Sequence, residues 1–186
     1  IYVNPQGPDA NPDPKLAAHD IRETFGRMAM NDYETAALVA GGHTFGKSHG
    51  AASESYKGPD PEASRLQDQS TGWNSGFKSG KGVDAISSGI EGAWTQNPIK
   101  WDMGYLDCLY GHDWELTKSP AGAHQWTPKK NSQKIKMVPD AHDKNVLHPP
   151  MMQTTDISMK VDPSYGPITK HFHKNPKEFH DAFARA

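Results

Sequence analysis

The sequence has only one cysteine, Cys108, among its 186 residues. A single thiol excludes both an internal disulfide and a zinc site built from several thiolates. The chain is also poor in apolar residues, which make up 34%, and no apolar run approaches the length of a membrane-spanning helix. A formal net charge of −2 gives no electrostatic reason to expect a nucleic acid or an anionic membrane as a partner.

Glycine and proline are abundant instead, with 17 and 15 residues. A lean, turn-rich chain needs a cofactor, a partner or the rest of a longer polypeptide to bury enough surface. The sequence opens without an initiator methionine or a signal-peptide pattern, and a helix predicted from Pro176 reaches Ala186 without a C-cap. We expect residues 1–186 to be an internal part of a larger domain; a domain with frayed ends is the alternative. The single cysteine favours a reducing, cytoplasmic location and leaves a secreted form open.

Two neighbouring helices are predicted in the first quarter of the chain. Residues 15–30 place Leu16, Ile21, Phe25 and Met28 at helical spacing. Asn31 and Asp32 can end that helix and cap a second one over residues 33–41. This second helix leads directly into a glycine-flanked histidine, His43.

The rest of the chain predicts long loops and short elements. Residues 48–81 are rich in glycine, serine and proline, so we expect an irregular stretch, pinned by Tyr56, Trp73 and Phe77. A denser, tryptophan-rich segment follows over 85–126, and a polar, basic surface loop over 127–148. A short buried turn or helix start is expected over 155–163, and then two short helices. The predicted fold class is therefore mostly α, with long irregular loops and little sheet.

Most of the ten histidines need no function. His142 and His148 lie in the basic loop, and His171 and His173 alternate on a polar stretch. None forms the His-Glu-x-x-His pattern of a zinc enzyme. For these residues a solvated surface position is the favoured interpretation.

His43 has a different setting. It follows the small apolar run 36–40 and lies between Gly42 and Gly46. Small residues and glycines let a flat ligand or another backbone approach closely. From the residues alone, a hydrogen-bonded core histidine is favoured over a ligand, and both interpretations stay open.

Residues 30–50, with the centre Gly-His-Thr-Phe-Gly, closely resemble the proximal haem-ligand segment of catalase-peroxidases. Other similar segments occur in the same order at 2–5, 20–25, 88–91, 115–123 and 155–157. The resemblance covers essentially the whole chain. It implies a haem-peroxidase fold, with residues 1–186 as the proximal part of the haem domain and haem b as the cofactor.

The resemblance assigns a proximal triad. His43 would ligate the haem iron, and Asp156 would accept a hydrogen bond from the other ring nitrogen, which raises the basicity of the imidazole. Trp94 would pack beside His43 and bond to the same carboxylate. Without the resemblance, Trp94 would be an ordinary core aromatic and Asp156 a helix cap. Further positions expected to contact the haem or its propionates are Gly42, Thr44, Gly46, Lys47, His49 and Ser88.

Tyr2 and Met28 match two members of the covalent Met-Tyr-Trp adduct that the family associates with its catalase reaction. The third member, a distal tryptophan, is not in this sequence. From the residues alone, a helical methionine and a tyrosine near the chain start indicate only packing.

The resemblance implies a catalase and broad-specificity peroxidase that acts on hydrogen peroxide and small-molecule electron donors, commonly as a homodimer. The family's distal Arg, Trp and His precede the matched region, so the remainder of the same polypeptide would supply them. Two alternatives remain: a monofunctional ascorbate or cytochrome c type peroxidase, and a haem-binding fragment without turnover. The long stretches at 51–85 and 127–150, together with Tyr2 and Met28, count against the monofunctional alternative.

Overall fold

The computed structural model describes residues 6, 8–68, 72, 74–86, 88–131, 135–140, 143 and 145–186. Within these residues the chain is mostly helical, with two small antiparallel hairpins, as the sequence predicts. The helices are α1 (Pro14–Gly26), α2 (Asp32–Gly42), α3 (Gly104–Gly111), α4 (Thr154–Val161), α5 (Tyr165–Lys174) and α6 (Pro176–Arg185). The strands are β1 (Trp114–Lys118), β2 (His124–Pro128), β3 (Val138–Pro139) and β4 (Leu147–His148).

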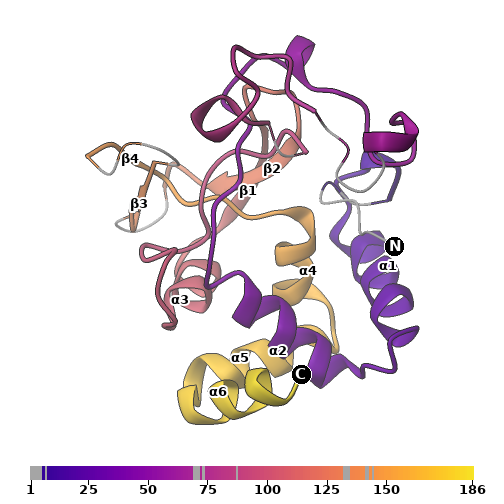
Figure 1. Cartoon of the computed structure of the whole chain (residues 1–186). Coiled ribbons are helices and arrows are strands. Elements are labelled where there is room, and N and C mark those ends of the chain that lie inside the picture. The colour runs from indigo at the N-terminus through magenta and orange to yellow at the C-terminus, as the bar shows by residue number, and fades with distance from the viewer. Residues whose placement is uncertain are drawn as a thin grey trace.

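Helix α4 lies in the middle of the molecule and contacts α1, α3 and α5 (Figure 1). Helix α2 packs against α5 and α6 below it, and the β1–β2 hairpin stands above α4 (Figure 1). The core therefore forms around α4. Its largest fully buried side chains include Tyr105, Tyr165, Phe172, Phe179 and Ile21.

Helix α1 ends at Gly26, earlier than the predicted Met30. The chain turns there because Ala29 adopts a positive φ of 61°, while the amide of Met30 donates to the carbonyl of Phe25. The predicted cap of α2 is confirmed. The Asn31 side chain accepts from the amide of Glu34 at 3.0 Å, and the Glu34 carboxylate accepts from the amide of Asn31 at 2.9 Å.

The segment between residues 85 and 128 contains a helix and a hairpin that the sequence does not predict individually. In the hairpin, Leu116 is paired with Trp126. Trp126 also bridges to Met152, and its indole donates to Thr154 Oγ1 at 3.1 Å. The hairpin thereby fixes the chain just before α4. Strands β3 and β4 show that the predicted loop at 127–148 is not wholly irregular.

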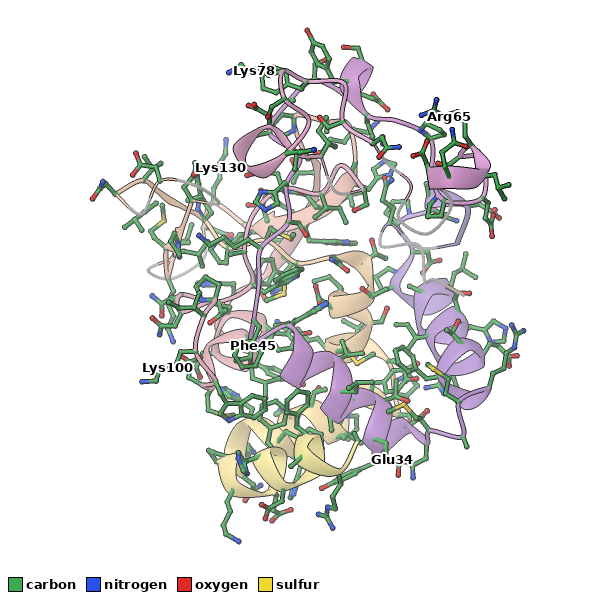
Figure 2. The ribbon with its side chains drawn as sticks, in the orientation of Figure 1. Glu34, Phe45, Arg65, Lys78, Lys100 and Lys130 are labelled. Atoms are coloured by element: carbon green, nitrogen blue, oxygen red, sulfur yellow. The ribbon has the colours of Figure 1, made fainter. Side chains whose placement is uncertain are left out.

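The long stretch at 48–81 is irregular as predicted, with short 3-10 turns at Glu54–Tyr56 and Leu66–Asp68. The ring centroids of Tyr56 and Phe77 lie 5.2 Å apart, while Trp73 lies outside the described residues. Arg65 and Lys78 mark this stretch at the top of Figure 2, far from Glu34 at the start of α2.

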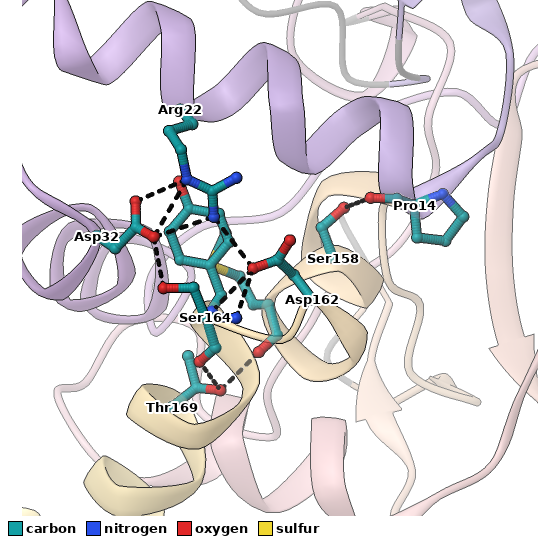
Figure 3. Close-up of polar contacts among 9 residues, drawn as sticks. Pro14, Arg22, Asp32, Ser158, Asp162, Ser164 and Thr169 are labelled. Atoms are coloured by element: carbon teal, nitrogen blue, oxygen red, sulfur yellow. Dashed lines mark hydrogen bonds and ion pairs between the residues drawn. The ribbon is translucent and has the colours of Figure 1, made fainter.

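A polar network joins α1 to the start of α2 and to the end of α4 (Figure 3). Arg22 Nε lies 3.0 Å from Asp32 Oδ1, and Arg22 Nη2 lies 3.1 Å from Asp162 Oδ1. Ser164 Oγ donates to Asp32 Oδ2 at 2.6 Å, and the Arg22 guanidinium stacks over the Tyr165 ring at 4.6 Å. Burial alone raises the pKa of Asp32, but Arg22 and Ser164 outweigh it and lower that pKa below its ordinary value.

A carboxyl group with a lowered folded-state pKa stabilises the fold above its unfolded pKa, and this contribution is lost as pH falls through the folded pKa. We expect Asp32→Asn to lower the free energy of unfolding at pH 7 by on the order of 1 kcal/mol. The difference from the wild type should begin to shrink below about pH 4 and should vanish only below the lowered folded-state pKa of Asp32. Denaturant unfolding between pH 2 and pH 7 measures this. Glu23→Gln, an exposed carboxylate on α1, is the control and should follow the wild type throughout; a parallel offset for Asp32→Asn at all pH values would contradict the prediction.

Candidate functional site

His43 directly follows Gly42, the last residue of α2. The buried side of α2 consists of small residues, with Ala36, Ala37 and Ala40 fully buried. Thr44, also fully buried, follows His43 and places its Oγ1 3.4 Å from the carbonyl of Ala40. Small side chains let α2 pack closely against its neighbours. This packing fixes the position of the helix end from which His43 extends.

The imidazole meets a carboxylate from a distant part of the chain. His43 Nδ1 lies 2.6 Å from Asp156 Oδ1, and the Asp156 side chain is 0% exposed. Tyr105 on α3 donates its hydroxyl to the same Oδ1 at 2.9 Å. The amide of Gln153 donates to Oδ2 at 2.7 Å, in the first turn of α4. A fully buried carboxylate requires such donors, and here they come from three separate elements.

This contact determines which ring nitrogen of His43 is available. A carboxylate only accepts hydrogen bonds, so in a neutral imidazole the proton is on Nδ1 and Nε2 keeps its lone pair. Within the described residues Nε2 makes no hydrogen bond, and the His43 side chain remains 25% exposed. A neutral histidine whose far nitrogen is fixed by a carboxylate is a common form of metal ligand.

Trp94 packs against His43 as predicted but does not bond to the carboxylate. The two rings stack with centroids 4.4 Å apart at an interplanar angle of 15°, and Trp94 is 6% exposed. Its indole nitrogen is buried and has no hydrogen-bond partner in the described part of the chain. The predicted Trp94–Asp156 hydrogen bond is therefore wrong, because Tyr105, His43 and Gln153 occupy the carboxylate instead.

Tyr105 is the member of this site that sequence reasoning missed. It lies in a short apolar helix, α3, where a tyrosine is indistinguishable from any core aromatic. Its ring meets the edge of His43 at a centroid distance of 5.8 Å. Burial and the charge of Asp156 raise the pKa of Tyr105 well above its ordinary value, so the phenol stays protonated and acts as the donor.

The other residues predicted to contact a haem lie on the segment after α2 or further along the chain. Gly46 adopts a positive φ of 82°, and its amide donates to the carbonyl of Pro98 at 2.8 Å. Lys47 donates to the main-chain oxygen of Asp140. Gly42 is exposed, His49 is partly buried, and Ser88 has a positive φ of 51°. Their contacts with a haem stay predictions.

The two predicted adduct residues lie away from this site or outside the described chain. Met28 follows the end of α1 and is 54% exposed, so the prediction of a helical, packed methionine is wrong. It precedes α2, whereas His43 follows it, and a helix of 11 residues is about 16 Å long. Tyr2 lies outside the described residues.

The surface histidines have carboxylate partners. His148 contacts Asp140 at 2.8 Å, and His171 contacts Glu178 at 2.7 Å. His173 lies 2.9 Å from Asp107 Oδ1, and His142 is outside the described residues. Among the residues that the structure describes, no group of three or more His, Cys, Asp or Glu side chains could hold a metal ion, and no helix is long and apolar enough to cross a membrane.

A mostly α fold with a carboxylate-bound histidine at the end of a helix is what the sequence led us to expect of a haem peroxidase. A family model described as Peroxidase matches residues 3–175. The chain therefore belongs to the peroxidase family.

Within that family the relatives are more specific. The chain is 63% identical over 187 residues to the catalase-peroxidase of Koribacter versatilis (strain Ellin345). It is 62% identical to that of Caulobacter sp. (strain K31) and 60% identical to that of Dechloromonas aromatica (strain RCB). Each alignment covers 100% of this chain and 25% of the relative, so the chain spans about a quarter of their length. The predicted similarity to catalase-peroxidases is confirmed.

Two adjacent glycines at the end of α2 allow a test of how His43 is held in place. A Cβ added to Gly41 would clash with the ring of Phe183 on α6, whereas one added to Gly42 would meet nothing within 4 Å. We expect Gly41→Ala to lower the free energy of unfolding by about 1–3 kcal/mol, because the added methyl overpacks the α2–α6 contact. Gly42→Ala should leave it unchanged or raise it by up to about 1 kcal/mol through helix propensity. Denaturant unfolding of both variants measures the difference; equal values would show that α6 does not constrain this end of α2.

Proposed function

We propose that residues 1–186 form the proximal side of a haem b site in a catalase-peroxidase, with His43 as the ligand of the iron. The parent protein would act as a catalase on hydrogen peroxide and as a peroxidase on small-molecule electron donors. The names of the relatives favour this function over a monofunctional peroxidase. The remainder of the same polypeptide would supply the groups on the opposite face of the haem.

One observation carries the proposal: the contact of 2.6 Å between His43 Nδ1 and a fully buried Asp156 carboxylate. This contact fixes the Nδ1 side of the ring, and within the described residues Nε2 makes no hydrogen bond. The donor set suits a haem, because one neutral imidazole is a sufficient protein ligand for haem iron. The His43 side chain is 25% exposed, and Trp94 stacks on one face of its ring.

In this site a bound haem would supply the redox chemistry, exchanging electrons with hydrogen peroxide and with electron donors. His43 would hold the iron through Nε2, and its Nδ1 proton would stay on the hydrogen bond to Asp156. That hydrogen bond raises the basicity of the imidazole, which favours the oxidised iron. Trp94 restricts rotation of the imidazole through ring stacking.

Several further parts of the proposal rest on the family. Gly42, Thr44 and Gly46 would line the haem beside its ligand, and Lys47, His49 and Ser88 would approach the propionates. Tyr2 and Met28 would contribute to the covalent adduct. We also propose a homodimer in the cytoplasm, the latter supported by the single buried cysteine.

The ligand assignment is tested in the full-length protein. We expect His43→Ala to lose the absorption spectrum of five-coordinate, histidine-ligated haem b, because the only proposed protein ligand is removed. Absorption spectra combined with a pyridine haemochrome assay measure both ligation and haem content. An unchanged histidine-ligated spectrum in this variant would refute the assignment.

Two further variants separate ligation from folding. His171→Ala removes an exposed histidine paired with Glu178 and should keep the wild-type spectrum. His43→Gly leaves a cavity that free imidazole can enter, so added imidazole should restore a nitrogen-ligated haem. If His43→Gly takes up haem but does not respond to imidazole, the ligand is another residue.

The role of Asp156 gives a second prediction. We expect Asp156→Asn to retain haem but to raise the midpoint potential of the iron by on the order of 60–120 mV, equivalent to a tenfold to hundredfold change in the reduction equilibrium. The loss of the negative charge makes His43 a weaker donor to the iron. Spectroelectrochemical titration measures the potential, with Glu178→Gln, the partner of surface His171, as the control. An unchanged potential in Asp156→Asn would contradict the proposed hydrogen-bond role.

A further inference from the structure

Tyr105 contacts the same carboxylate oxygen as the proposed iron ligand. Its hydroxyl lies 2.9 Å from Asp156 Oδ1, which lies 2.6 Å from His43 Nδ1. Tyr105 and Asp156 are both 0% exposed, so no bulk water competes for this bond. A buried hydrogen bond to a charged group is among the stronger ones in proteins.

The direction of this bond follows from the chemistry of the two groups. A carboxylate can only accept, and the charge of Asp156 together with burial raises the pKa of the phenol well above its ordinary value. Tyr105 is therefore the donor in this hydrogen bond. Each donor draws negative charge away from the carboxylate, so the Tyr105 hydroxyl competes with the Nδ1 proton of His43 for Oδ1.

Trp94 does not donate a hydrogen bond to the Asp156 carboxylate. Oδ1 already accepts from His43 and Tyr105, and Oδ2 accepts from the amide of Gln153. The indole nitrogen of Trp94 is buried without a partner in the described chain. Tyr105 is thus the side chain, besides His43, that is placed to tune this carboxylate.

We infer that Tyr105 is a positioning residue that holds Asp156 and limits the basicity of His43, and so raises the reduction potential of the iron that His43 would ligate. This inference rests on the proposed function, because it requires haem bound through His43. By this inference Tyr105 raises the reduction potential of the iron, whereas the negative charge of Asp156 lowers it. A merely structural tyrosine would leave the potential unchanged.

The test uses the full-length, haem-loaded protein and the variant Tyr105→Phe, which removes only the hydroxyl. We expect the equilibrium constant for one-electron reduction of the iron to fall about threefold to tenfold, where tenfold corresponds to about 59 mV. The frequency of the iron–histidine stretch in resonance Raman spectra of the ferrous protein should rise, because a stronger Asp156 acceptor gives the imidazole more anionic character.

Tyr110→Phe is the matched control. Tyr110 lies on the same helix, and its hydroxyl bonds to the carbonyl of Gly166 at 3.0 Å and to Thr169 Oγ1 at 2.7 Å instead of to Asp156. This variant also loses a tyrosine hydroxyl from α3, so it reports any general effect of such a loss. Its potential and its iron–histidine frequency should both equal those of the wild type.

The outcomes separate this inference from the proposed function. A lower potential with a higher iron–histidine frequency in Tyr105→Phe alone supports the inference. A wild-type protein with His43-ligated haem, but no change in either quantity in Tyr105→Phe, overturns the inference and leaves the proposed function intact. A wild-type protein that binds no haem through His43 overturns both. Equal shifts of the potential and of the iron–histidine frequency in Tyr105→Phe and Tyr110→Phe would also overturn the inference. The effect would then come from the loss of any tyrosine hydroxyl on α3.

Discussion

The buried charge of Asp156 is the constraint on which the rest of the site depends. An isolated carboxylate without solvent contact is very unfavourable, so the fold must bring donors to it. These donors come from the end of α2, from α3 and from the backbone at the start of α4. The first turn of α4 adds favourable electrostatics, since unpaired amides at a helix N-terminus attract negative charge. Loss of any one of these elements would remove a hydrogen-bond donor from the carboxylate. The geometry of the site therefore depends on the packing of all three elements.

Helix α4 is held from several sides, which explains how it can carry a buried charge. Ser158 donates to the carbonyl of Pro14 at the start of α1 at 2.7 Å. Lys160 donates to the carbonyl of Leu109 at 3.0 Å and to that of His112 at 2.8 Å, so it satisfies the C-terminal end of α3. These bonds tie the C-terminal half of α4 to α1 and α3, which fixes the rotation of α4 and with it the direction of the Asp156 side chain.

The sequence predicted those parts of the fold that depend on local signals. The helix with the Asn31 cap follows from a side chain and an amide three residues apart, and the irregular stretch at 48–81 follows from its composition. Helix α3 was missed because no side-chain cap marks its start. The early end of α1 was missed because Ala29, at a φ of 61°, is a residue that gives no signal for a left-handed turn. These errors arise where the chain carries no local signal for the structure that it adopts.

The candidate site could not be predicted from local sequence patterns alone. His43 and Asp156 lie 113 positions apart, and only the resemblance to a family paired them before the structure did. That resemblance also supplied the wrong partner for Trp94, because a carboxylate has few acceptor positions and a neighbouring residue decides how they are filled. Tyr105 fills one of them here.

A division of roles between two aromatic residues follows from this geometry. Trp94 lies parallel to the His43 ring at 4.4 Å, so it limits motion of the imidazole without touching its hydrogen bond. Tyr105 meets the ring at its edge, at 79°, and acts on the carboxylate beyond it. The plane of the ring and the strength of its hydrogen bond are therefore set by different residues, on different segments of the chain. A substitution that changes the packing of the imidazole need not change its basicity, and the reverse also holds.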